Sequence, residues 1–276
     1  MGQFKSLDGQ NSGFENKRAV ILGGSGAIGS AVAMTLARRG AEIHLGGRSV
    51  ASVENSAKCI RDAGGTVFAF QADVLDPDEL DRKARQLAED HGPVDIVLNA
   101  TGFMHDQGKE IAEISAKEFL HDVEIFLAAA FNVAKAFTPH MGGDRPGVIV
   151  SVVAPASKMA IPGHVSHIVA CAGVEAFSKA LAAELGPRNI RSVCLRTHAI
   201  VDAIDAGSYT LNLFEPKAKA LGLTVPEWLE AAAQTTMTKR LPTLAQVAET
   251  ITFIASEHSA AMTGTIVNMT AGAIVD

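Results

Sequence analysis

Three glycines near the start of the sequence have the spacing of a phosphate-binding turn. The apolar run at residues 19–22 leads into Gly24, Gly26 and Gly29, which form the pattern G-x-G-x-x-G just before a stretch of helical periodicity. Glycines permit a tight turn and a close backbone approach, and the helix N-terminus offers free N–H groups to an anion. A turn in this context predicts a site for the pyrophosphate of a dinucleotide.

The second apolar run, residues 42–46, ends in Gly47, Arg48 and Ser49. An NAD site would place an acidic residue here to hold the ribose 2'-hydroxyl. Gly47 leaves room for a 2'-phosphate instead, and the Arg48 guanidinium supplies a bidentate partner for it. We therefore expect NADP(H) rather than NAD(H). The alternative is an arginine that only caps a loop.

Two histidines and a cysteine share one predicted helical face, because His164, His167 and Cys171 lie at i, i+3 and i+7. An imidazole with an ordinary pKa near neutrality makes His167 a candidate proton donor. Cys171 is a candidate nucleophile, or else a buried inert thiol. With His198, the same residues are a weaker candidate for a zinc site. Side chains that merely line a pocket are the remaining alternative.

The elements that would hold these residues follow a regular alternation. Short apolar runs, typical of buried parallel strands, alternate with longer amphipathic stretches. The predicted strands are residues 19–22, 42–46, 66–71, 94–99, 148–153, 192–195 and 265–269. The predicted helices begin near Ile28, Val50, Pro77, Ser115, Val165 and Thr243. This alternation predicts an α/β fold, a single-domain doubly wound parallel sheet (Rossmann fold) of about seven strands.

The domain is expected to span residues 17–276, after a loose arm at residues 1–16. Residues 205–238 are helical in composition but lie outside the strand–helix rhythm. Because an excursion after a late strand usually covers a ligand crevice, we expect this segment to cover the substrate. A packed surface insertion is the alternative. The pairs His105–Asp106 and His121–Asp122 are interpreted as surface charge.

The bulk composition excludes several function classes. The formal net charge is -6, and no run of Lys or Arg indicates a nucleic-acid partner. The sequence contains no apolar run of 18 residues, so no membrane-spanning helix is predicted. The three cysteines are scattered and odd in number, which favours a reducing compartment over a disulfide framework. We expect a cytoplasmic protein that acts on a small molecule.

Several ordered motifs resemble the short-chain dehydrogenase/reductase family, from Lys17 to the end of the chain. The glycine turn is followed by Asp73 after the third predicted strand and by Asn99, Ala100, Thr101 and Gly102 after the fourth. The resemblance implies that Asp73 lies near the adenine and Asn99 near the cofactor ribose. Turn and resemblance together give the predicted cofactor-binding residues Gly23, Gly24, Ser25, Gly26, Ile28, Gly29, Arg48, Ser49, Asp73, Val74, Asn99, Ala100 and Gly102. By the same resemblance, the long helices after Ser115 and Gly163 pair across subunits in a homodimer or homotetramer.

The catalytic positions depart from that family. Its tetrad is Asn, Ser, Tyr and Lys, and the corresponding positions here are Phe126, Ala154, His167 and Cys171. Phe126 and Ala154 have no side-chain hydrogen-bond donor, and Cys171 cannot replace a cation. The family's Pro-Gly pair beside the nicotinamide reads Thr197-His198. The cofactor half of the site is therefore expected to be retained and the catalytic half rewritten.

Three hypotheses follow. The first is an NADP(H)-dependent oxidoreductase with His167, Cys171 and His198 as catalytic candidates and no metal. The second is an NADP(H)-binding sensor, regulator or inactive subunit. The third is a non-redox enzyme on the same scaffold. The only tyrosine, Tyr209, lies in the predicted covering segment and would support the first hypothesis if it reached the site.

Overall fold

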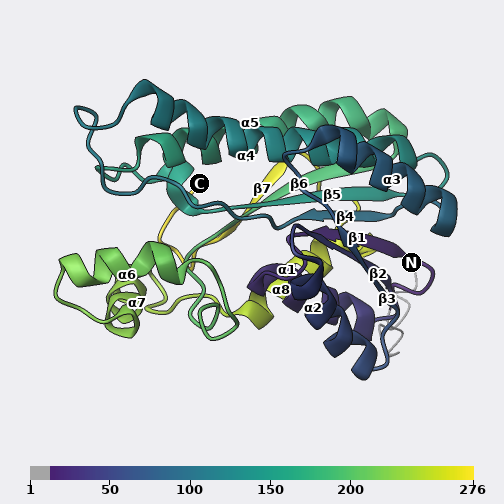
Figure 1. Cartoon of the computed structure of the whole chain (residues 1–276), viewed down its shortest axis with the longest axis horizontal. Helices are drawn as coiled ribbons and strands as arrows, with labels where there is room; N and C mark the ends of the chain where they lie inside the picture. Colours follow the sequence, from purple (N-terminus) through teal and green to yellow (C-terminus); the bar gives the residue numbers. More distant parts are fainter. Residues whose placement is uncertain (1–12) are drawn as a thin grey trace, which may run out of the picture.

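The computed structural model describes residues 13–276, which form one seven-stranded parallel sheet with helices on both faces (Figure 1). The strands are β1 (Arg18–Leu22), β2 (Glu42–Gly47), β3 (Val67–Gln71), β4 (Ile96–Asn99), β5 (Gly147–Val153), β6 (Ile190–Thr197) and β7 (Thr265–Met269). The helices are α1 (Ala27–Arg38), α2 (Val50–Asp62), α3 (Pro77–His91), α4 (Ala116–Phe137), α5 (Val165–Leu185), α6 (Leu211–Ala220), α7 (Val225–Gln234) and α8 (Leu244–Ala255). The predicted doubly wound fold is confirmed.

Short-range signals in the sequence set the limits of several helices. The Asp76 side chain caps α3 by accepting a hydrogen bond from the backbone N–H of Glu79, and Pro77 begins the helix. Ser115 and Glu118 form a reciprocal capping box at the start of α4, as their spacing predicts. These caps satisfy N–H groups that would otherwise lack partners, and so fix where the helices begin.

The central strands are apolar on both faces because a helical layer covers each face. One core packs around α1, α2 and α8, with residues such as Ile21, Val32 and Ile251 fully buried. The other packs around α3 and α4, with Phe137 at its centre. Figure 1 shows these two layers on opposite sides of the sheet.

The strand order is β3-β2-β1-β4-β5-β6-β7, so the chain reverses direction across the sheet between β1 and β4. Leu22, the last residue of β1, pairs with Asn99, the last residue of β4. Loops leaving neighbouring strands in opposite directions open a crevice at this point, which is where open α/β sheets bind ligands.

The segment after β6 lies beside this end of the sheet. Residues 205–238 contain α6 and α7, which pack on each other and project from the main body (Figure 1). At the other end of the chain, residues 1–12 of the expected loose arm lie outside the described residues. Phe14 is buried, and its N–H donates to the Arg39 carbonyl oxygen. Within residues 13–276, no helix is long and apolar enough to cross a membrane.

Candidate functional site

A cavity of about 720 Å³ lies at the carboxyl ends of the strands. It extends from the glycine turn after β1 to the inner faces of α6 and α7. A cavity of this size can hold a dinucleotide end together with a small molecule. Most of the predicted cofactor-binding residues line it: Gly23, Ser25, Gly26, Ile28, Arg48, Asp73, Val74, Ala100 and Gly102.

The glycine turn is packed too closely for any side chain. Gly23 has φ +78°, and a Cβ there would lie 2.6 Å from the Ala100 carbonyl oxygen. A Cβ on Gly29 would lie 2.3 Å from the Gly23 carbonyl oxygen. Gly26 is the N-cap of α1 and provides no side-chain cap, so the first N–H groups of the helix remain free for an anion. The cradle therefore fits a dinucleotide pyrophosphate.

Four predicted cofactor-binding residues do not line the cavity, each for a local reason. Gly24 faces Leu45, and Gly29 packs on the turn itself. Ser49 is the N-cap of α2, where its hydroxyl accepts from the Ser52 N–H. The Asn99 side chain turns back toward Thr101, whose hydroxyl donates to Asn99 Oδ1 at 2.6 Å.

Arg48 is exposed at the rim of the cavity and takes part in no ion pair among residues 13–276. Asp73 lines the same end, and its Oδ1 accepts from the Leu75 N–H at 2.9 Å. A Cβ on Gly47 would lie 2.8 Å from Val53, so the backbone beside Arg48 is also tightly packed. The guanidinium is thus available to an anionic ligand.

At the opposite end, the cavity wall contains a cluster of three rings. The His105 and His167 imidazoles stack with centroids 3.7 Å apart and planes within 12°. The Phe126 ring meets both edge-on, at 5.7 and 5.5 Å. Burial, reinforced by the positive charge of neighbouring groups, lowers the pKa of His167 to about 3. His167 is therefore neutral at physiological pH, which corrects the expectation of a pKa near neutrality.

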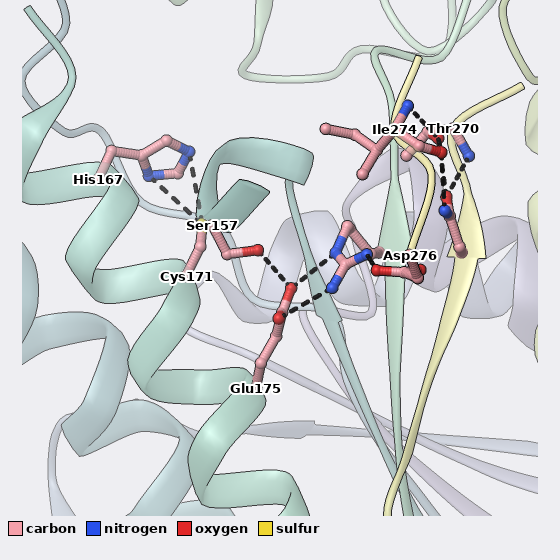
Figure 2. A network of polar contacts seen from close by, with 9 residues as sticks. Ser157, His167, Cys171, Glu175, Thr270, Ile274 and Asp276 are labelled. Carbon is pink, nitrogen blue, oxygen red and sulfur yellow. Dashed lines mark hydrogen bonds and ion pairs between the residues drawn. The ribbon is translucent and has the colours of Figure 1, made fainter. Parts of the chain in front are cut away.

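Cys171 lies one turn after His167 on α5 (Figure 2). It is fully buried and does not line the cavity. Its Sγ is 3.8 Å from Nδ1 and 3.7 Å from Nε2 of His167, so the thiol is aimed at neither nitrogen. Burial raises the pKa of Cys171 to about 12. A protonated, enclosed thiol is a poor nucleophile, and the structure corresponds to the inert alternative. Ala154, by contrast, does line the cavity.

Two other histidines of the cavity have a defined neutral form. His164 Nδ1 donates to the Pro162 carbonyl oxygen at 2.8 Å, which leaves Nε2 as an acceptor. His198 Nδ1 accepts from the Ala199 N–H at 2.7 Å, which leaves the proton on Nε2. Burial lowers the pKa of both imidazoles. The wall thus offers hydrogen-bonding groups but no imidazolium charge.

Tyr209 reaches into the cavity from the segment that precedes α6. Its ring lies directly over Gly102, where a Cβ would be only 2.2 Å from the ring. Burial of the hydroxyl raises the pKa of Tyr209 to about 12. The only tyrosine of the chain therefore does reach the candidate site.

A buried ion pair joins the middle of α5 to β6. The Arg196 guanidinium donates to both carboxylate oxygens of Glu175, at 2.8 and 3.0 Å, and also to Asp276 at 2.6 Å. The Ser157 hydroxyl donates to the same carboxylate at 2.5 Å (Figure 2). Arg196 immediately precedes Thr197 and His198, which line the cavity, so the network holds this part of β6 against α5.

The weaker zinc hypothesis finds no support in this geometry. His164, His167, Cys171 and His198 do not form a set of ligand atoms close enough to hold an ion. Within the described part of the chain, the group that does so is Glu42, His44 and His91, away from the cavity. The Glu42 Oε1 already accepts hydrogen bonds from Arg18 at 2.7 Å and from His44 at 2.8 Å.

The interpretation of two histidine–aspartate pairs as surface charge is wrong in part. Asp122 is buried, and its Oδ2 accepts from the Ser166 hydroxyl at 2.6 Å and from the Asp106 N–H at 2.9 Å. His105 lines the cavity, as do Gln107 and Lys217, which sequence reasoning did not select. The position of His105 and Gln107 after the fourth strand was a usable signal, because that end of the sheet binds ligands.

The fold and the glycine cradle define a Rossmann-type, nucleotide-binding α/β protein. The family model described as Enoyl-(Acyl carrier protein) reductase matches residues 24–273. The 3-oxoacyl-[acyl-carrier-protein] reductase FabG of Chlamydia muridarum is 27% identical over 263 residues, which cover 95% of this chain and 99% of the relative.

Solved structures of similar proteins have the same fold. The crystal structure of gox2181 superposes with a TM-score of 0.83 at 25% identity, covering 96% of this chain and 98% of that one. Sorbitol-6-phosphate 2-dehydrogenase from Erwinia amylovora has the same fold, with a TM-score of 0.84 at 21% identity over 94% of this chain and 100% of that one. The protein belongs to the short-chain dehydrogenase/reductase family, a family of oxidoreductases that bind nicotinamide cofactors.

Proposed function

We propose that this protein is an NADP(H)-dependent oxidoreductase with a non-standard active site. The observation that carries the proposal is the continuity of one cavity, which joins the glycine cradle and Arg48 to His167 and His198. Residues that bind a cofactor and residues that contact a substrate must share such a space for transfer between the two. Residues 205–238 would cover the substrate, since α6 and α7 both line this cavity.

Arg48 supports the choice of NADP(H). Its guanidinium is exposed at the rim, next to the small Gly47, and pairs with no carboxylate of the described residues. A 2'-phosphate would gain a charge-assisted contact there, whereas a 2'-hydroxyl would gain little. Asp73, at the same end, would lie near the adenine.

His167 would act as a neutral hydrogen-bond donor. When bound, the cofactor would supply a hydride. The residues that replace the family's tetrad include Phe126 and Ala154, which offer no hydrogen bond. An imidazole whose pKa is held low can still polarise a carbonyl or imine through its N–H, without giving up an imidazolium proton. The Tyr209 hydroxyl is a further hydrogen-bond donor that reaches the cavity.

A specific observation favours a second candidate, an NADP(H)-binding protein without dehydrogenase activity. The pKa of His167 is about 3 and that of Tyr209 is about 12, so neither group exchanges a proton readily near neutral pH. The Tyr209 ring also occupies the space over Gly102, beside the cofactor cradle. A sensor or inactive subunit would need the cradle and Arg48 but no proton donor.

We also propose that the protein is a homodimer or homotetramer. Leu120 and Phe131 lie about three turns apart on α4 and are 57% and 51% exposed, and Val169 on α5 is 40% exposed. Large apolar side chains on two adjacent helices are more typical of a subunit interface than of a solvated surface. These are the helices that the family resemblance assigns to subunit pairing.

The test begins with calorimetric titration of NADPH and NADP+ into the wild type and Arg48→Ala. Tight binding that weakens in the variant supports the cofactor assignment and justifies a screen of enones, imines and ketones, with His167→Ala as the control. Binding without turnover of any of them would favour the second candidate. If neither NADPH nor NADP+ binds, both candidate functions are contradicted.

A further inference from the structure

The cavity contains a cation that forms no ion pair with a carboxylate of the described residues. Lys217, on α6, lines the cavity, and its Nζ donates to His164 Nε2 at 2.8 Å. None of the ion pairs among residues 13–276 includes Lys217. Of the residues that the structure describes, three charged ones line the cavity: Arg48, Asp73 and Lys217. Arg48 follows β2 and Asp73 follows β3, so both lie at the cofactor end of the cavity. Of the three charged residues, Lys217 is the one that lies at the substrate end.

A buried acceptor near Lys217 also lacks a partner. His105 Nδ1 donates to the Phe103 carbonyl oxygen at 2.8 Å, so His105 Nε2 can only accept. That nitrogen lies 2.5 Å from Gln107 Nε2, which must be the donor. The amide orientation is thus determined, and Gln107 Oε1 is left buried with no hydrogen bond among the described residues. Such an acceptor carries a desolvation cost that a ligand donor would remove.

The cation and the acceptor belong to one region of the cavity. The positive charge of Lys217 contributes to lowering the pKa of both His105 and His167, and Gln107 is one hydrogen bond from His105. The wall beyond them is apolar. Leu213 and Phe214 of α6 line it, and Phe214 lies against Trp228 of α7 with ring centroids 4.6 Å apart.

We propose that Lys217 and Gln107 select a substrate that is mostly apolar and carries a carboxylate with an adjacent O–H or N–H donor. The carboxylate pairs with the Lys217 ammonium, the donor bonds to Gln107 Oε1, and the apolar part packs against Phe214 and Trp228. A charge-assisted hydrogen bond in a partly buried site is stronger than a neutral one, so the carboxylate dominates selectivity. The inference rests on the proposed function, because it assigns the substrate end of the same cavity.

The probes are three matched compounds: 2-hydroxy-4-phenylbutanoate, its methyl ester, and 4-phenylbutanoate. Each is titrated by calorimetry into protein saturated with NADPH, where the hydroxy acid cannot be oxidised, and into cofactor-free protein. We expect the hydroxy acid to bind at least about tenfold more tightly than the ester, and several-fold more tightly than the deoxy acid. Lys217→Met should abolish the first difference and Gln107→Met the second.

Lys219→Met, an exposed lysine on the same helix, is the matched control and should leave all three affinities unchanged. If Lys217→Met does not fold, Lys217→Arg should retain the preference for the acid and Lys217→Gln should lose it. Equal affinity for acid and ester, or no binding of any probe, overturns the inference. NADPH binding is measured separately by its fluorescence, so a failure of the proposed cofactor is distinguished from a failure of the substrate assignment.

Discussion

The imidazole rings of His105 and His167 stack at a centroid distance of 3.7 Å, although 62 positions separate them in the sequence. One ring comes from the loop after β4 and the other from the first turn of α5. Two stacked imidazoles cannot both be imidazolium cations without strong repulsion, and burial lowers the pKa of each. The pair is therefore neutral, and it provides N–H groups and lone pairs rather than charge.

His167→Ala is expected to lower kcat by about 100-fold, because it removes one hydrogen-bond donor from the reacting group. His167→Gln, which keeps an N–H, should retain part of the rate. Since the pKa of His167 is about 3, the wild-type rate should show no titration of this residue between pH 5 and 7. Steady-state kinetics over that range test both points. His121→Ala, which replaces an exposed histidine of α4, is the control. If the wild-type rate changed with pH in this range and the change disappeared only in His167→Gln, the proposal that His167 is neutral would be refuted.

Arg48→Ala should raise the Kd for NADPH by about 10- to 100-fold, the range expected for losing a hydrogen bond between charged groups. NADH lacks the 2'-phosphate, so its Kd should hardly change in the variant. Calorimetric titration of both cofactors into both proteins measures this difference. Equal affinity of the wild type for NADPH and NADH would show that Arg48 does not read the 2'-phosphate.

The affinity for a carboxylate probe should fall as the pH rises through 8. Burial lowers the pKa of Lys217 to about 8, so its ammonium form, which binds an anion, is lost above that value. The Kd of 2-hydroxy-4-phenylbutanoate should rise about tenfold between pH 7 and 9, as follows from a single titration at pKa 8. The neighbouring His105, His164 and His167 have lowered pKa values and remain neutral throughout. The methyl ester should show a flat profile, and a flat profile for the acid would exclude Lys217 as its partner.

Glu175→Gln should decrease the free energy of unfolding by about 3 kcal/mol, because it leaves the Arg196 guanidinium buried without its bidentate partner. Urea denaturation measures the change. Asp81→Asn breaks an exposed ion pair with Arg85 and should cost less than about 0.5 kcal/mol. Similar losses for the two variants would mean that the buried pair contributes no more than a surface pair.

Light scattering should give the mass of two or four chains. Replacing Leu120 and Phe131 together by Glu should shift the protein toward monomers, since two charges would be buried at the proposed interface. Ile111→Glu, at an exposed position outside the helices, should leave the assembly unchanged. A monomeric wild type would contradict the proposed interface.

The fold could be predicted because its signals are local. Apolar runs located all seven strands, and predicted helix starts at Val50, Pro77 and Val165 coincide with the observed ones. Strand ends were less accurate: β6 runs over Ile190–Thr197 rather than 192–195, because Arg191 and Arg196 interrupt the apolar pattern. Arg196 is nevertheless buried, neutralised by Glu175 from another element, and no local pattern indicates such a pairing.

The cofactor cradle was predictable for the same reason, since its glycines are contiguous in the sequence. The substrate end was not. Lys217 reaches the cavity only because α6 lines it from outside the strand–helix alternation. His105 meets His167 only because the loop after β4 lies against the start of α5, where the Gly108 N–H donates to the Gly163 carbonyl oxygen. The pKa of His167 could not be anticipated either, because burial by Phe126 and the approach of other basic groups are properties of the assembled site.

The contact between Tyr209 and Gly102 joins the segment before α6 to the loop after β4. A Cβ at position 102 would lie 2.2 Å from the Tyr209 ring, so even alanine there would require the ring to move. The two positions are thus expected to change together during evolution. Among relatives of this chain, a side chain at position 102 should accompany a small residue at position 209, and a bulky aromatic at 209 should accompany glycine at 102.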